Sequence, residues 1–259
     1  MPQSTSNRAK AHSAAKKRSA ARSRDTAEPV DNVTTVYNEL RSLIITGQLP
    51  PGARVAERAV VARTGHSRTP VRSALHRLQQ EGLVASVGRP GDQRLIVTPL
   101  TDADGHEVFL LEGHLEGLAA RQAASLPLER RQQLAHRLRE INRGFAAAAR
   151  TRTAPAKLFS FDHQFHETFV EAASGPRLLA LHGSLRPQSE RYARLYVGVL
   201  LADLPNSVKE HEAIAAAIAK GNRAAAQRAA ERNWMNAARR LAKVIVKQGE
   251  RGTRRPAKA

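Results

Sequence analysis

The 259-residue sequence predicts a mostly α-helical fold in two parts, a small N-terminal unit that closes with a β-hairpin and a larger all-helical bundle. Apolar residues recur at helical spacing from residue 33 to 82 and again from about 101 to 247. Between these stretches the spacing changes to that of two short strands around a turn-rich loop. The second stretch is also rich in alanine, the strongest helix former.

Both ends of the chain are basic and poor in apolar residues. Residues 1–30 contain no aliphatic side chain larger than alanine between Met1 and Val30. Such a segment cannot offset the entropy cost of ordering, so we expect a disordered basic arm, and a second basic tail over residues 249–259. Either segment can add sequence-independent phosphate contacts or be a solvated tail with no specific role.

Residues 31–99 are expected to begin with three helices. The first spans 33–47 and closes at Leu49-Pro50-Pro51-Gly52, and the second spans 56–65 and ends at a glycine turn. The third runs from Ser67, a suitable N-cap, to Glu81, with Gly82 as its stop. One face of this third helix is cationic, and the other carries the apolar residues Val71, Ala74, Leu75 and Leu78.

The hairpin completes a known arrangement. Residues 83–87 and 94–97 form short strand-like runs around a loop that holds Arg89. Three helices followed by a hairpin make a winged helix-turn-helix, which is a DNA-binding unit. Arg68 and Arg72 lie one turn apart on the polar face of the third helix, where both can reach one groove of DNA. Arg89, near the tip of the wing, can enter a minor groove or be an ordinary loop arginine.

The charge balance favours a polyanionic partner. There are 42 Lys and Arg residues against 23 Asp and Glu, a formal net charge of +19, so we expect double-stranded DNA to be bound. The absence of cysteine excludes a disulfide framework and a thiolate zinc site. With no apolar run of 18 residues and no leader-like start, the sequence predicts a cytoplasmic protein without a membrane partner.

Residues 100–248 are expected to form an all-helical domain that Thr101 opens as an N-cap. Breaks near residues 126, 154, 175, 205 and 221 divide it into about six helices. Asp162 and His166 lie at i and i+4 beside an apolar stripe, and His211 opens a similar stripe, so all three should point inward. His163 is turned about 100° away and is expected at the surface.

These patterns resemble the GntR family of bacterial transcription regulators, in its FadR-like group with an FCD-type effector domain. The resemblance is strong in Leu49–Gly52, Ala56–Arg58, Ser67–Leu75 and Glu81–Val84, and weaker in Leu115–Ala120, Asp162–His166 and His211–Asn222. It implies a homodimeric, ligand-responsive regulator, a repressor that a small metabolite releases from a pseudo-palindromic operator. The DNA contacts that it implies are Arg58, Ser67, Arg68, Thr69 and Arg72.

The resemblance further implies a divalent metal (Zn, Ni or Mn) on Asp162, His166, His211 and one more histidine, beside a pocket for a carboxylate effector. Asn233 stands at the fourth ligand position, and an amide is a weak donor for such ions. Glu112 stands where the group commonly has an arginine that pairs with a carboxylate. Arg191 and Tyr192 are candidates to replace that arginine in the effector pocket.

Several alternatives stay open at this point. The three inward polar residues can form an altered metal site, line a metal-free pocket, or be ordinary buried polar groups. Two other functions compete with a regulator: a metal-dependent enzyme using Asp162, His166 and His211, and a sequence-nonspecific nucleoid-type DNA-binding protein.

Overall fold

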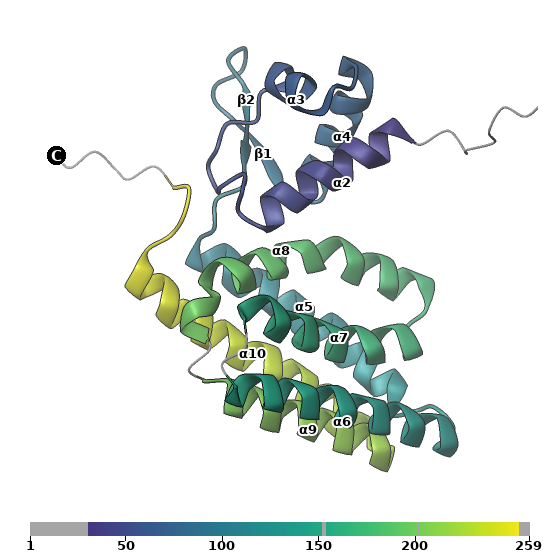
Figure 1. The fold of residues 1–259 in the computed structure, drawn as a ribbon. Coiled ribbons are helices and arrows are strands. Elements are labelled where there is room, and N and C mark those ends of the chain that lie inside the picture. The colour runs from purple at the N-terminus through teal and green to yellow at the C-terminus, as the bar shows by residue number, and fades with distance from the viewer. Residues whose placement is uncertain (1–30, 152–153, 201–202, 254–259) are drawn as a thin grey trace, which may run out of the picture.

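The computed structural model describes residues 31–151, 154–200 and 203–253, so the predicted arm over 1–30 and the end of the tail lie outside the described residues. Within the described ranges the predicted fold class is confirmed: helices dominate, and the one described sheet has two strands. The winged unit stands at one end of the molecule, and α6 and α9 lie farthest from it (Figure 1). No helix of the described residues is both long and apolar enough to cross a membrane.

The N-terminal unit consists of α2 (Asn32–Ile45), α3 (Glu57–Thr64), α4 (Arg68–Gln80) and a hairpin of β1 (Val84–Val87) and β2 (Arg94–Val97). The strands are antiparallel, with Val84 opposite Val97. The apolar stripe predicted on α4 is buried and packs against α2 and the hairpin, in a core that includes Val36, Leu40, Ile44, Leu75 and Leu78. The polar face of α4 is therefore left toward solvent.

The turn before α4 has the predicted shape, but one expected bond is missing. Gly65 ends α3 with a left-handed backbone at φ 70°. Ser67 takes the N-cap position in an extended conformation, yet its side chain makes no cap hydrogen bond. Pro70 occupies the third helical position and has no N–H, which removes one of the two donors that the Ser67 hydroxyl could accept from; the other is the N–H of Thr69.

The bundle contains the six predicted helices: α5 (Asp102–Ala123), α6 (Leu128–Arg150), α7 (Pro155–Ala173), α8 (Pro176–Leu200), α9 (Leu204–Lys220) and α10 (Arg223–Gln248). α5 packs along α10, and α6 packs against both α7 and α9. The main core draws on all six helices, α8 through Leu178, and includes Leu138, Phe165, Phe169, Ile214 and Ile218. Small alanines on α5 and α10 let these two helices approach closely.

Helix α8 connects the bundle to the winged unit. Its Gln188 donates to the backbone carbonyl of Glu81, the residue that caps the C-terminus of α4, at 2.8 Å. Arg191 donates to the carbonyl of Thr98 at 2.7 Å. Leu195 packs closely on Gly47, since a Cβ added to that glycine would lie 2.7 Å from the Leu195 side chain. In Figure 1, α8 lies directly beneath α2, so the same helix contacts several parts of the winged unit.

The start of the C-terminal tail is ordered, so the expectation of disorder is wrong for Arg251. Its backbone forms two hydrogen bonds with the backbone of Leu100, with N to O distances of 2.8 and 2.9 Å. Its guanidinium lies 4.8 Å from the centre of the Tyr196 ring. Gly252 lies so close to Gly52 that a Cβ on Gly52 would be 2.7 Å from its Cα. Backbone pairing and cation–π contact need no apolar side chain, which is why composition missed them.

Thr101 opens α5, as predicted, and accepts a hydrogen bond from the Asp104 N–H at 3.2 Å. We expect Thr101→Ala to destabilise the protein by about 1 kcal/mol, because an orphan helix N–H loses its acceptor. For a bundle of this size that corresponds to a melting temperature lower by roughly 2–4 °C. Thr101→Ser keeps the hydroxyl and is the matched control. Equal melting of the two variants, followed by circular dichroism, would contradict the capping role.

Candidate effector site and nucleic-acid interface

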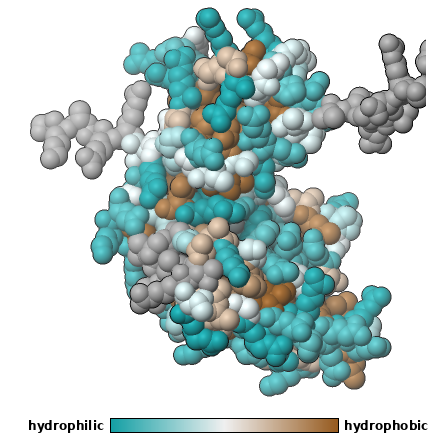
Figure 2. Space-filling model, in the orientation of Figure 1, coloured by the Kyte–Doolittle hydropathy of each residue, from teal (hydrophilic) through white to brown (hydrophobic). Residues whose placement is uncertain are grey.

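The residues predicted to contact DNA all lie on the exposed surface of the winged unit. They come from α3, the start and polar face of α4, and the loop between the strands, and are Arg58, Ser67, Arg68, Thr69, Arg72 and Arg89. This end of the molecule is largely hydrophilic in the space-filling view (Figure 2). Arg68 forms no ion pair within the described part of the chain, so its guanidinium is available to a phosphate or a base.

Arg72, unlike Arg68, forms an ion pair within the winged unit. Its Nε and Nη2 each lie 3.2 Å from a carboxylate oxygen of Glu57 on α3, although 74% of the Arg72 side chain is exposed. This two-point contact holds the guanidinium against the helix before the turn. An exposed ion pair of this kind is weak, so DNA can compete for Arg72 at small cost.

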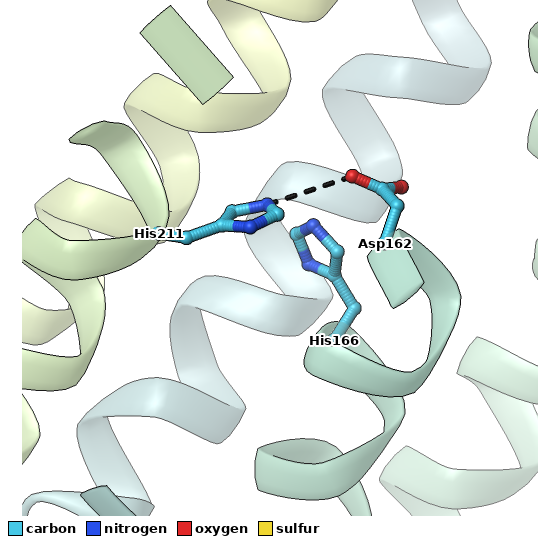
Figure 3. Close-up of side chains that lie close together, drawn as sticks. All are labelled: Asp162, His166 and His211. Atoms are coloured by element: carbon cyan, nitrogen blue, oxygen red, sulfur yellow. Dashed lines mark ion pairs between the residues drawn. The ribbon is translucent and has the colours of Figure 1, made fainter. Parts of the chain in front are cut away.

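Asp162, His166 and His211 meet inside the bundle, as predicted, and are called the Asp–His–His cluster below (Figure 3). Asp162 and His166 come from successive turns of α7, and His211 faces them from α9. His211 Nε2 lies 3.5 Å from Asp162 Oδ1, and the potential ligand atoms of all three lie within 4.8 Å of one another. The cluster therefore has the dimensions of a cation site.

His211 has the chemistry of a metal ligand. The residue is fully buried, and within the described part of the chain neither ring nitrogen has a hydrogen-bond partner, the Asp162 contact at 3.5 Å being an ion pair only. Its ring stacks on Phe165 with centroids 4.0 Å apart. Burial, reinforced by His166, lowers the pKa of His211 to about 3, so the imidazole is neutral at physiological pH. Neutral imidazole is the form that binds transition metals.

Glu116 orients the second histidine. Its Oε2 lies 2.5 Å from His166 Nδ1, which leaves His166 Nε2 as the ring atom for a ligand or metal. Burial opposes charge on His166, but the adjacent Glu116 carboxylate outweighs it and raises the pKa of the histidine. A carboxylate behind a histidine in this way is the usual support of a metal-bound imidazole. Two imidazoles and one carboxylate fit a divalent ion with an open coordination position.

Asn233, at the position expected for a fourth ligand, is engaged elsewhere. It is buried, and its Nδ2 donates to Glu210 Oε2 at 2.9 Å, across the contact between α9 and α10. An amide that donates through nitrogen to a carboxylate is fixed in orientation. The residues that could hold a metal here are therefore the three members of the Asp–His–His cluster.

Glu112, Glu116 and His182 form a second buried group, called the Glu–Glu–His cluster below. His182 Nε2 lies 3.2 Å from Glu116 Oε1 and 3.6 Å from Glu112 Oε2. Ser189 donates to the other oxygen of Glu112 at 2.9 Å. Burial, followed by repulsion from Glu116, raises the pKa of Glu112 to about 7. Glu112 therefore faces this cluster, and it does not line the cavity described next.

A cavity of about 270 Å³ lies beside both clusters, with Asp162 and Ser189 in its wall. Its apolar lining includes the aromatic side chains Phe109, Phe145, Phe159 and Trp234, and its charged lining consists of Asp162, Glu190, Arg186, Arg194 and Arg240. A mostly apolar pocket with a few fixed charges is typical of a small-molecule site. Its size suits a small metabolite.

Arg186 is the arginine that connects the cavity with the clusters. Its Nε and Nη2 lie 3.1 and 2.9 Å from His163 Nδ1, and its Nη1 lies 3.8 Å from Glu116 Oε1. The expectation that His163 lies at the surface is only partly right: 44% of its side chain is exposed, but the rest lines the cavity wall. The reason is that α8 covers this side of α7 and brings Arg186 onto His163.

Arg191 and Tyr192 do not face the cavity in this structure. Arg191 is bonded to Thr98, and Tyr192 donates to the carboxylate of Asp104 at 2.6 Å and also accepts from the Thr101 N–H at 2.9 Å. Both side chains therefore bind the segment between β2 and α5. They act at the junction of the winged unit and the bundle. Arg186 is the arginine that lies in the cavity wall, where Arg191 and Tyr192 had been expected.

Sequence reasoning missed His182, Arg186 and Ser189, although a signal was present. The three lie at i, i+4 and i+7 on α8 and so share one helical face. The same spacing rule had identified Asp162 and His166 on α7. On α8 the pattern is harder to see, because Pro187 stands inside the helix and polar residues occupy several faces.

Comparisons with known proteins agree with this geometry. Residues 32–91 match the family of bacterial regulatory proteins described as the gntR family, and residues 107–234 match the FCD domain. An HTH-type transcriptional regulator of Agrobacterium vitis is 33% identical over 142 residues, which cover 55% of this chain and 81% of that protein. A probable D-xylose utilization operon transcriptional repressor of Paenarthrobacter nicotinovorans is 31% identical over 164 residues, which cover 59% of this chain and 66% of that protein.

Solved structures give the same fold. McbR/YncC of E. coli superposes with a TM-score of 0.65 at 19% identity, over 83% of this chain and 99% of that one. A putative GntR transcriptional regulator from Rhodococcus sp. RHA1 superposes with a TM-score of 0.62 at 21% identity, over 81% of this chain and 96% of that one. The fold and the relatives define the class: the chain is a ligand-responsive DNA-binding transcription regulator and not an enzyme. It belongs to the GntR family and carries an FCD domain.

Proposed function

We propose that the protein is a homodimeric repressor that leaves a pseudo-palindromic operator when a small carboxylate metabolite binds its FCD domain. The observation that carries the proposal is the exposed basic face of α4, with Arg68 unpaired within the described residues. A relative in Paenarthrobacter nicotinovorans is described as a probable repressor, which supports the sign of regulation. Two recognition helices of a dimer would read half-sites about one turn of DNA apart.

The effector would bind in the cavity beside the Asp–His–His cluster. There Arg186 would pair with its carboxylate by exchanging His163 Nδ1 for two carboxylate oxygens. A divalent metal on Asp162, His166 and His211 would supply a Lewis-acidic contact for the effector. The aromatic lining would hold the apolar part of the metabolite.

Helix α8 provides a physical route from this site to DNA. Arg186 and Ser189 face the site, while Gln188 and Arg191 on the same helix bind Glu81 and Thr98 of the winged unit. A ligand that favours a different position of α8 would therefore favour a different position of α4. Such a ligand shifts the population between DNA-binding and non-binding arrangements only through its different affinity for the two.

The proposal is tested by selecting DNA that binds the purified protein and mapping the protected bases. We expect a short pseudo-palindrome, occupied by two chains, and release when metabolite pools enriched in small carboxylates are added. Protection without two-fold symmetry would contradict the homodimer, and equal affinity for all duplexes at moderate salt would instead support the nucleoid-type alternative.

Arg186→Ala is expected to retain operator binding. The effector concentration needed to release the protein from the operator should rise at least tenfold, because a charge-assisted contact in a partly buried site is lost. Operator affinity is measured by fluorescence anisotropy with and without effector. Arg177→Ala is the matched control, since Arg177 is exposed on the same helix and its loss changes the net charge equally. Equal effector sensitivity of the two variants would remove Arg186 from the effector site.

A further inference from the structure

The structure assigns a second cation site to this protein, at the Glu–Glu–His cluster, where Glu112, Glu116 and His182 would bind a divalent first-row metal such as Mn²⁺ or Zn²⁺. This goes beyond the proposed function, in which the metal lies at the Asp–His–His cluster. The two sites would be neighbours that share the Glu116–His166 contact.

The hydrogen-bond pattern of the cluster is incomplete. His182 offers a single nitrogen, Nε2, to two carboxylates, and one N–H can donate to only one of them. Glu112 is completely buried, and among the described residues its Oε2 has no hydrogen-bond partner, since His182 Nε2 stays 3.6 Å away. A buried carboxylate oxygen without a partner is costly. A cation placed among the three groups would satisfy Glu112 Oε2 and the His182 nitrogen together.

The distances suit a metal. With bonds of about 2.0–2.2 Å to nitrogen and oxygen, the ligand atoms of a tetrahedral ion stand roughly 3.3–3.6 Å apart. His182 Nε2 lies 3.2 Å from Glu116 Oε1 and 3.6 Å from Glu112 Oε2. Small shifts of side chains would therefore complete the site, without any change of the helices α5 and α8 that carry them.

The surrounding groups fit this assignment. Ser189 fixes the other oxygen of Glu112, which leaves Oε2 directed at the cluster. Glu116 Oε2 is used by His166, so its Oε1 is the oxygen left for a cation. Arg186 is the opposing charge, with Nη1 3.8 Å from Glu116 Oε1, but two of its nitrogens are directed to His163. When His166 is neutral, as it is when it binds a metal, the two carboxylates face only the one guanidinium. Carboxylates with one imidazole favour Mn²⁺ or Zn²⁺.

The test counts metal ions bound to the full chain after chelation, dialysis and titration with Mn²⁺ or Zn²⁺. We expect two ions per chain in the natural protein and one in each of Glu112→Gln, His182→Ala and His211→Ala. Glu112→Gln is nearly isosteric and keeps an acceptor for Ser189, so it protects the test against misfolding. His114→Ala, an exposed histidine on the same helix as Glu112, is the matched control and should keep both ions.

The outcomes separate this site from the metal of the proposed function. One ion that is lost in Glu112→Gln and His182→Ala but kept in His211→Ala would support the second site and contradict the first. Full stoichiometry in both Glu112→Gln and His182→Ala would overturn the assignment, as would one ion that only His211→Ala removes, or no bound ion at all.

Discussion

Replacing Arg68 by alanine is expected to lower operator affinity by roughly 10- to 100-fold, while the fold and the effector site stay intact. The side chain is exposed at the first position of α4 and forms no ion pair within the described residues, so nothing in the structure depends on it. A bidentate contact of arginine to guanine is worth about 1–3 kcal/mol, which corresponds to this range. If Arg68 binds only phosphate, the loss should instead be similar on all sequences.

The measurement is a binding titration with the operator and with an unrelated duplex, at several salt concentrations. Arg137→Ala on α6 is the matched control, because it removes an equal charge from an exposed helical position far from the winged unit. If the operator affinity of Arg68→Ala equals that of Arg137→Ala, α4 is not the recognition helix. Arg72→Ala should lower operator affinity by a similar or slightly smaller factor, since the exposed Glu57 pair that DNA must displace is weak.

Removing bound metal is expected to lower the melting temperature by roughly 5–15 °C. A ligand present at 100 to 1,000 times its dissociation constant stabilises the folded state by about 3–4 kcal/mol, and each kcal/mol is worth roughly 2–4 °C in a domain of this size. The stabilisation has a clear structural origin, since a metal would coordinate the fully buried His211, whose ring nitrogens have no hydrogen-bond partner among the described residues.

The comparison is made within each variant, by melting the chelated and the Zn²⁺-loaded forms. This cancels the direct cost of the substitution. In His211→Ala at least half of the metal-dependent shift should disappear, whereas His136→Ala, exposed on α6, should keep all of it. A natural protein whose chelated form melts at the same temperature as the loaded form would contradict a stabilising metal at the Asp–His–His cluster.

Much of the fold was predictable because its signals are local. The stripe of α4, the glycine turns at Gly65 and Gly82 and the cap at Thr101 depend on residues close in sequence. Helical periodicity alone predicted the inward direction of His166 and His211, which are buried, and of Asp162, which lines the cavity. Such patterns need no knowledge of which helix packs on which.

The remainder of the site depends on contacts between distant segments. Glu112 and His182 are 70 positions apart, and only the packing of α5 against α8 brings them together. The same packing assigns Arg186 to the cavity and Arg191 to the junction, although they are close in sequence. The missing Ser67 cap shows a smaller limit, because a propensity for one residue ignored the proline three positions later.

The contacts between Gly52 and Gly252 and between Leu100 and Arg251 have a consequence for protein engineering. A chimeric regulator made by joining this winged unit to another sensor domain at residue 100 would lose a backbone pairing contributed from the far end of the chain. If the new domain supplied a segment in the place of residue 252, any residue other than glycine there would clash with Pro51 and Gly52. A chimera that keeps this winged unit therefore has to keep residues 249–252 as well, although they come from the far end of the chain.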